Sequence, residues 1–179
     1  MNAFDSIFSK IGSAEVTKRG DFLRDGDYLL EVSEIKLFNG NSGATHVVEL
    51  IVREAKAKKV GVEPNAVGSK ASFVNVLAGK TKDVAPGKIK GFCLEFVGED
   101  VKRTDPAKAG QIVAQITGTD TDPARGRIMR GAMIRAETYE FTSRSGVQGV
   151  GVNWFHVPGQ TKSDIAARAA AQDGTAPAK

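Results

Sequence analysis

Two consecutive segments constrain the architecture most: Arg135-Ala-Glu-Thr-Tyr139-Glu-Phe-Thr-Ser-Arg144-Ser-Gly146 and Gly149-Val-Gly-Val-Asn-Trp154-Phe155-His156. Each carries aromatic or apolar side chains at alternating positions, and the polar residues between them predict a tight turn, so we expect a β-hairpin. Successive side chains of a strand point to opposite faces. One face of this hairpin can therefore join a core while the other exposes rings and cations.

Strand patterns also occur earlier in the chain. The five expected strands cover residues 26–38, 45–54, 69–77 and 129–142, with a last strand that ends at residue 157. In the first strand the apolar positions change parity after Val32, which predicts a bulge or a strong bend. Pro158 and Gly159 end the last strand.

Helical spacing separates the third strand from the fourth. Apolar residues from Ile89 to Val97 recur at intervals of three and four, and Asp105-Pro106 opens a second run with one apolar side. The sequence therefore predicts a mainly β fold, a five-stranded barrel like the OB-fold, with a helical insertion between strands 3 and 4 and short terminal helices. Other small barrels and sandwiches also have five strands and remain alternatives.

The expected domain organisation has three parts. Residues 1–20 are expected to form an N-terminal helix and connector, because Phe4, Ile7 and Phe8 recur at helical spacing. Residues 21–159 would form the OB-fold-like domain. Residues 160–179 are Ala-rich with little to bury, so we expect a flexible tail.

Composition favours a globular chain with one core, since 41% of the 179 residues are apolar and 26% are charged. Lys and Arg number 25 against 21 Asp and Glu, and clustered cations of this kind favour either a polyanionic partner or a solubilising surface. Cys93 is the single cysteine, which predicts an intracellular, cytoplasmic protein. No apolar run approaches membrane length and the N-terminus lacks a secretory pattern, so we expect no membrane association.

Catalytic and metal-binding patterns are not evident in the sequence. His46 and His156 are the only two histidines, and neither accompanies a cysteine pair or a carboxylate at metal-ligand spacing. Nucleophilic catalysis has no obvious base. We therefore expect no enzymatic activity, no metal and no cofactor.

The chain resembles the single-stranded DNA-binding proteins of double-stranded DNA bacteriophages, a divergent OB-fold group. The resemblance covers most of residues 25–158 and is carried by three segments: Gly26-Asp-Tyr-Leu-Leu-Glu-Val32, Pro86-Gly-Lys-Ile-Lys-Gly-Phe92, and Arg135 to Tyr139 together with Asn153-Trp154-Phe155. It implies a non-enzymatic protein that coats transient single strands during replication or recombination in the host cytoplasm. Replication or recombination proteins would be further partners.

The residue types agree with such a role. Bases would stack on Tyr139 and Trp154. If the strand faces are reversed, they would stack instead on Phe73 and Phe155, with Asn75 on the same face as Phe73. Phosphates would follow the cations Arg53, Lys70, Arg125, Arg127, Arg130, Arg135 and Arg144.

Strand parity alone leaves the faces open. Trp154 shares parity with Val150 and Val152, as a core residue would. Tyr139 lies on a mixed face with Arg135, Glu137 and Phe141, and we expect it to be exposed. The alternative to DNA binding is a structural or host-protein-interaction module that uses the barrel surface and the N-terminal helix. An acidic tail with an apolar tip, by which many bacterial single-strand binders recruit partners, is missing from residues 173–179. Oligomeric state and the preference for DNA or RNA stay open.

Overall fold

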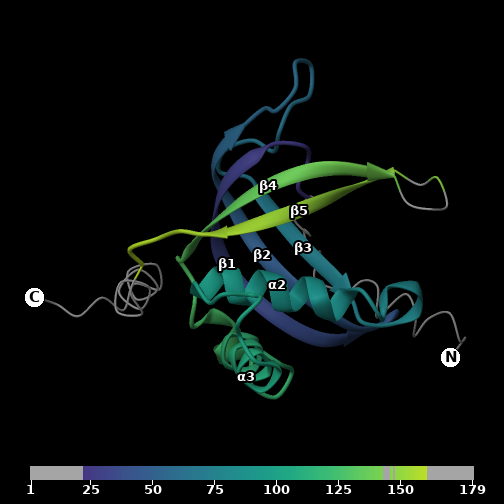
Figure 1. Ribbon diagram of the computed structural model, residues 1–179, viewed down its shortest axis with the longest axis vertical. Helices are drawn as coiled ribbons and strands as arrows, with labels where there is room; N and C mark the ends of the chain where they lie inside the picture. The colour runs from purple at the N-terminus through teal and green to yellow at the C-terminus, as the bar shows by residue number, and fades with distance from the viewer. Residues whose placement is uncertain (1–21, 143–145, 147, 161–179) are drawn as a thin grey trace, which may run out of the picture.

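The computed structural model describes residues 22–142, 146 and 148–160, and within them the chain forms one antiparallel sheet with two α-helices. The strands are β1 (Asp27–Gly40), β2 (Gly43–Lys56), β3 (Lys70–Val76), β4 (Met133–Thr142) and β5 (Gln148–His156). Their order in the sheet is β3-β2-β1-β4-β5 (Figure 1). The prediction of a mainly β fold with five strands is confirmed. The expected N-terminal helix, Arg144 and the tail beyond Gln160 lie outside the described residues.

Irregularities in β1 explain its change of parity. The pairing with β2 shifts between Leu29 and Leu30 and again between Val32 and Glu34. The first shift leaves Arg53 of β2 without a partner, and the second does the same for Ser33 of β1. The extra residue in β1 changes its parity, so that Leu30 and Val32 before it and Ile35 after it are all fully buried. The predicted bulge is therefore confirmed, and it bends β1 around the core.

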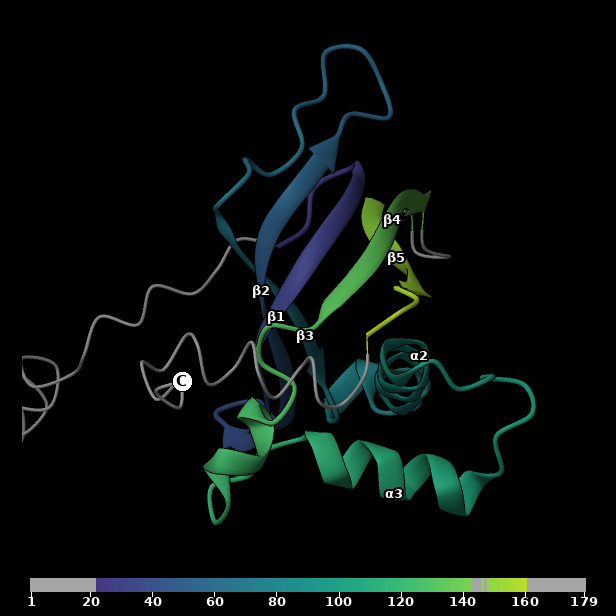
Figure 2. The same cartoon turned by 90° about the vertical axis from the view of Figure 1, so that its left-hand side faces the viewer.

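The sheet is not closed. Strands β3 and β5 are its two edges, and no β3–β5 pairing is present in the described part of the chain. Helix α2 (Ala85–Val97) contacts both edge strands and lies beneath the space between them, as Figures 1 and 2 show from two sides. Side chains rather than backbone hydrogen bonds therefore join the two edges.

Both helices lie between β3 and β4, as the sequence predicts. Pro86 lies in the first turn of α2, and Gly98 ends the helix in the left-handed conformation, with a φ of 77°. Helix α3 (Pro106–Ile116) begins at Asp105, whose carboxylate accepts a hydrogen bond from the Lys108 backbone N–H at 3.0 Å. In Figure 2 α2 is seen end-on while α3 lies lengthwise below it.

Residues 129–132 were expected to begin the fourth strand, and that prediction is wrong. They follow the short 3₁₀ helix η2 (Pro123–Arg127) as a turn, in which the Arg130 N–H donates to the Arg127 carbonyl and Gly131 has a φ of 85°. A positive φ interrupts a strand, so β4 starts only at Met133.

Hydrogen bonds and an ion pair fasten the long β2–β3 connection to the rest of the fold. Buried Asn65 accepts hydrogen bonds from the Arg24 N–H and the Tyr28 hydroxyl. Lys58 donates to the Thr138 carbonyl at 2.7 Å, and Lys59 forms an ion pair with Glu140 at 2.7 Å. These lysines therefore help to anchor the loop.

Within the described residues, none of the helices has both the length and the apolar character that crossing a lipid bilayer requires.

Candidate nucleic-acid interface

A groove of about 1420 Å³ runs between β3 and the β4–β5 hairpin, above α2. Because β5 is an edge strand, side chains from both of its faces reach the groove. Its lining includes Phe73, Asn75, Lys88, Glu95, Lys102, Tyr139, Phe141, Val150, Asn153, Trp154 and Phe155. Its volume is well above the roughly 490 and 500 Å³ of two other cavities in the described residues.

Three exposed aromatic rings line the groove. Tyr139 is 46% exposed, and Phe141 and Phe155 are each 42% exposed. The strand register places all three on the sheet face opposite the core, since Tyr139 pairs with Gly151, Phe141 with Gly149 and Phe155 with Arg135. The predicted exposure of Tyr139 is confirmed, and the rings offer stacking surfaces to a planar ligand.

The rings of Tyr139 and Phe141 are neighbours without being stacked on each other. Their centroids lie 6.3 Å apart and their planes are inclined by 50°. Phe141 was not among the site residues predicted from the sequence, although it follows Tyr139 at the same strand parity. That parity was the available signal.

Trp154 belongs to the core. It is 8% exposed, and its ring makes edge contacts with Phe73 and Phe92 at centroid distances of 5.0 Å each. The register explains this burial, because Trp154 pairs with buried Ala136 on the inner face. A buried ring has no free face for a base, so we do not retain Trp154 as a stacking residue.

Phe73 and Asn75 also face inward from β3. Phe73 is partly buried against the core, and Asn75 is 5% exposed. Both belong to the lining of the groove, but neither is exposed. The ring of Phe73 therefore serves mainly to join β3 to β5 through Trp154.

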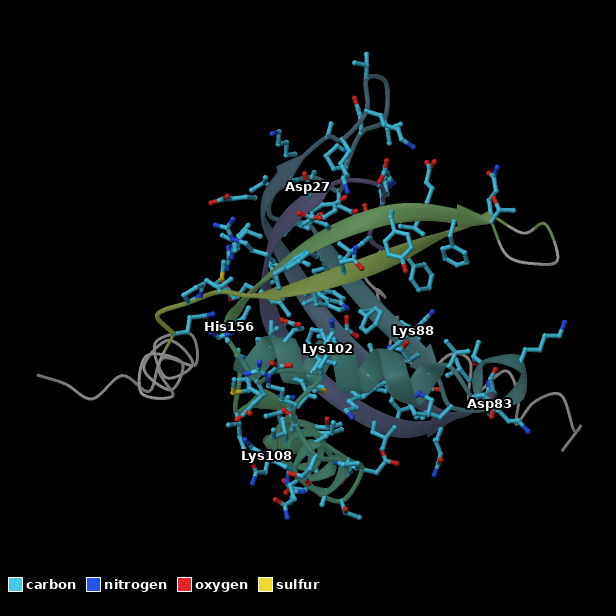
Figure 3. All side chains as sticks on the ribbon, in the orientation of Figure 1. Asp27, Asp83, Lys88, Lys102, Lys108 and His156 are labelled. Carbon is cyan, nitrogen blue, oxygen red and sulfur yellow. The ribbon has the colours of Figure 1, made fainter. Side chains whose placement is uncertain are left out.

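Two lysines supply positive charge at the groove. Lys88 comes from α2 and Lys102 from the segment after it, and Figure 3 shows both on the side of the molecule where β5 lies. Within the described residues neither ammonium group forms an ion pair, whereas Glu95 contributes one negative charge to the same lining. Neither lysine was among the site residues predicted from the sequence.

Arg135 lies beside the groove, opposite Phe155 in the β4–β5 ladder. It is exposed and borders a cavity of about 500 Å³ whose lining also includes Glu54 and Glu137. Its charge can therefore reach a phosphate at that end of the hairpin, although two carboxylates share its surroundings.

The other predicted cations that the structure describes do not line the groove. Arg53 on β2 donates to the carboxylate of Glu31 at 2.7 Å, and this hydrogen bond raises the pKa of Arg53. Arg125 pairs with Asp122 at 2.7 Å and Arg127 with Glu34 at 3.1 Å. Arg130 donates to the Ser33 carbonyl, and Lys70 is exposed at the start of β3.

A second cavity, of about 490 Å³, lies between α2, α3 and the β1–β2 hairpin. Its lining is mostly apolar and includes Ile89, Val113 and His46. His46 is 1% exposed, and neither of its ring nitrogens has a hydrogen-bond partner in the described residues. Burial of the ring lowers the pKa of His46 from 6.5 to about 4.

This burial predicts a pH-dependent stability. Because the pKa of His46 is 6.5 in its ordinary state and about 4 in the fold, the unfolded chain binds a proton in that interval and the folded protein does not. The contribution of neutral His46 to the free energy of unfolding is therefore complete above pH 6.5. The free energy of unfolding falls by about 3 kcal/mol as the pH falls from 6.5 toward 4. Urea unfolding at several pH values, compared between the protein and His46→Leu, should show it. A stability difference between the two that does not change with pH would contradict the prediction.

Comparison with known proteins adds no relative: no protein-family model matches the chain, and no curated protein matches it significantly. Among the described residues, no group of three His, Cys, Asp or Glu side chains could hold a metal ion.

Proposed function

We propose that this protein binds single-stranded DNA without sequence specificity and without enzymatic activity, as a coating protein in phage replication or recombination. The observation that carries the proposal is the groove in which Tyr139, Phe141 and Phe155 are exposed beside Lys88 and Lys102, whose ammonium groups form no ion pair with any residue that the structure describes. Stacking on rings and contacts to phosphates are the two interactions that bind a single strand of any sequence.

The strand order supports an OB-fold-like reading of the domain. In the order β3-β2-β1-β4-β5 the two edges are the strands whose pairing would close a five-stranded Greek-key barrel, and a helix lies at the space between them. Here that space forms part of the groove. An open edge would give a single strand access to side chains of both β3 and β5.

The first test is a fluorescence-anisotropy titration of labelled oligo-dT and of a duplex of the same length, at low and moderate salt. We expect tight binding of the single strand that weakens as salt rises, and much weaker binding of the duplex, whose bases are already stacked and paired. Absence of single-strand binding at low salt would exclude the proposed function.

The two lysines give a separate prediction. Replacing Lys88 and Lys102 with glutamine should weaken binding and lower the slope of log affinity against log salt by about 0.7 for each phosphate contact removed. Lys80→Gln with Lys82→Gln is the matched control, because it removes the same charge from exposed positions outside the groove lining. Equal slopes for the two double variants would show that general charge, not the groove, binds the phosphates.

A protein-interaction module is the alternative, and the apolar second cavity between α2 and α3 is the observation that favours it. It predicts binding of a protein partner with little salt dependence and no single-strand binding. The anisotropy titration therefore separates the two functions directly.

A further inference from the structure

We propose that Gly149 and Gly151 are positioning residues that hold the rings of Phe141 and Tyr139 against the backbone of β5, as a platform for two successive unstacked bases. The proposal rests on the proposed function and adds to it a structural requirement and a substrate class. The required substrate is an extended single strand, in which neighbouring bases are separated.

The geometry begins with the strand register. Tyr139 and Phe141 alternate on β4, and their cross-strand partners Gly151 and Gly149 alternate on β5. Each ring therefore lies on the same face as a residue that has no side chain. The ring can extend across the neighbouring strand instead of standing away from the sheet.

The space above each glycine is occupied by the far end of a ring. A Cβ atom added to Gly149 would lie 2.8 Å from Cζ and 3.0 Å from Cε1 of Phe141. A Cβ atom added to Gly151 would lie 2.6 Å from the hydroxyl oxygen and 2.7 Å from Cε2 of Tyr139. These separations are too short for real contacts, so an alanine at either position must displace the ring.

Backbone conformation does not explain these glycines. Neither Gly149 nor Gly151 has a positive φ, whereas Gly146 in the preceding turn does. Glycine weakens a strand interior, and its use there often marks close approach of another group. At these two positions the approaching group is the aromatic ring.

The arrangement fixes the rings for binding. One side of each ring faces the strand, and the exposed fractions of 46% for Tyr139 and 42% for Phe141 leave surface open to a ligand. A ring held in place before binding loses less conformational freedom when a base stacks on it. The lost freedom would otherwise weaken the complex.

The spacing selects the substrate. The two centroids are 6.3 Å apart, whereas stacked bases of a duplex follow each other at about 3.4 Å along one strand. Successive bases can therefore meet the two rings only after they have separated. This requirement favours extended single strands over duplexes and over stacked single strands.

The test is a double-mutant cycle on binding of oligo-dT, with folding checked by thermal unfolding. We expect Gly151→Ala to weaken binding about tenfold, because the displaced ring loses one stacked base. In a Tyr139→Ala background the same substitution should have no further effect, since no ring remains to be displaced. Gly87→Ala is the control, because Gly87 lies on α2 outside the groove lining and an added Cβ would meet nothing within 4 Å.

A second pair, Gly149→Ala and Phe141→Ala, repeats the cycle independently if Gly151→Ala does not fold. Unchanged affinity for both glycine variants, or an equal loss with and without the facing ring, would overturn the positioning role. A lower melting temperature with unchanged affinity would be such a result, and it would assign the glycines to strand packing alone.

Ring-current shifts in the NMR spectrum keep the platform separate from the proposed function. The Hα protons of Gly149 and Gly151 should resonate upfield in the free protein, and the shift should disappear in Phe141→Ala and Tyr139→Ala respectively. Absence of these shifts would overturn the platform itself. Shifts without any oligo-dT binding would instead exclude the proposed function and, with it, the role of the platform in stacking bases.

Discussion

Replacement of Tyr139 and Phe141 together by alanine is expected to weaken oligo-dT binding about a hundredfold, because each ring that stacks on a base contributes about 1–3 kcal/mol. Both rings lie on the outer face of β4 and take no part in the buried core. The double variant should therefore keep most of the stability of the native protein. Anisotropy titrations at low salt measure the affinity, and thermal unfolding measures the fold.

The matched control removes apolar surface from elsewhere on the domain. Val67 is 65% exposed and Ile128 is 56% exposed, and neither lines the groove. We expect Val67→Ala with Ile128→Ala to bind oligo-dT as the native protein does. Native affinity in the Tyr139/Phe141 variant would remove the groove as the binding site and leave its exposed rings as a surface for a protein partner.

Local sequence patterns were sufficient for the elements of this fold. Alternation predicted the five strands, the parity change after Val32 predicted the irregular β1, and the spacing of apolar residues predicted both helices. These features depend on neighbours within a few residues, where backbone geometry controls which side chains share a face. Closure of the sheet depends instead on the distance between β3 and β5, which no local pattern encodes.

The cations of the site were less predictable, because their neutralising partners are remote in the chain. Arg127 pairs with Glu34, which lies 93 positions earlier, and Arg53 pairs with Glu31 on the adjacent strand. A cluster of arginines in the sequence is therefore not the same as a surface with unpaired charge. Lys102, which stands apart from any lysine cluster, instead reaches the groove through the turn after α2.

The assignment of faces in the β4–β5 hairpin is the second point at which the sequence was insufficient. Parity separates Trp154 from Phe155 but does not say which of the two enters the core. The register with β1 settles it, because Tyr28 pairs with Ala136, and Ala136 in turn pairs with Trp154. Because Tyr28 is buried, Ala136 and Trp154 also lie on the inner face of the sheet.

Trp154 and Phe155, which are adjacent in the chain but lie on opposite faces of β5, give the second large prediction. Trp154→Ala should lower the free energy of unfolding by about 3–5 kcal/mol, because it leaves a cavity among the rings that join β3, β5 and α2. Natural domains are stable by only about 5–15 kcal/mol, so this loss is a large part of the total. The cause of this large loss is specific to the fold, because β3 and β5 do not pair with each other. The ring of Trp154 contacts those of Phe73 and Phe92, each at a centroid distance of 5.0 Å, and these contacts hold the two edge strands together.

Phe155→Ala is the matched comparison, since it removes a ring one residue away on the opposite face of the same strand. Its 42% exposure predicts a change in unfolding free energy below about 1 kcal/mol, together with weaker oligo-dT binding. Urea unfolding followed by circular dichroism measures both variants without relying on the emission of the tryptophan that one of them lacks. If Phe155→Ala lowered the free energy of unfolding more than Trp154→Ala, the two faces of the hairpin would be the reverse of those described. The exposed surface of the groove would then belong to the strand face that carries Trp154.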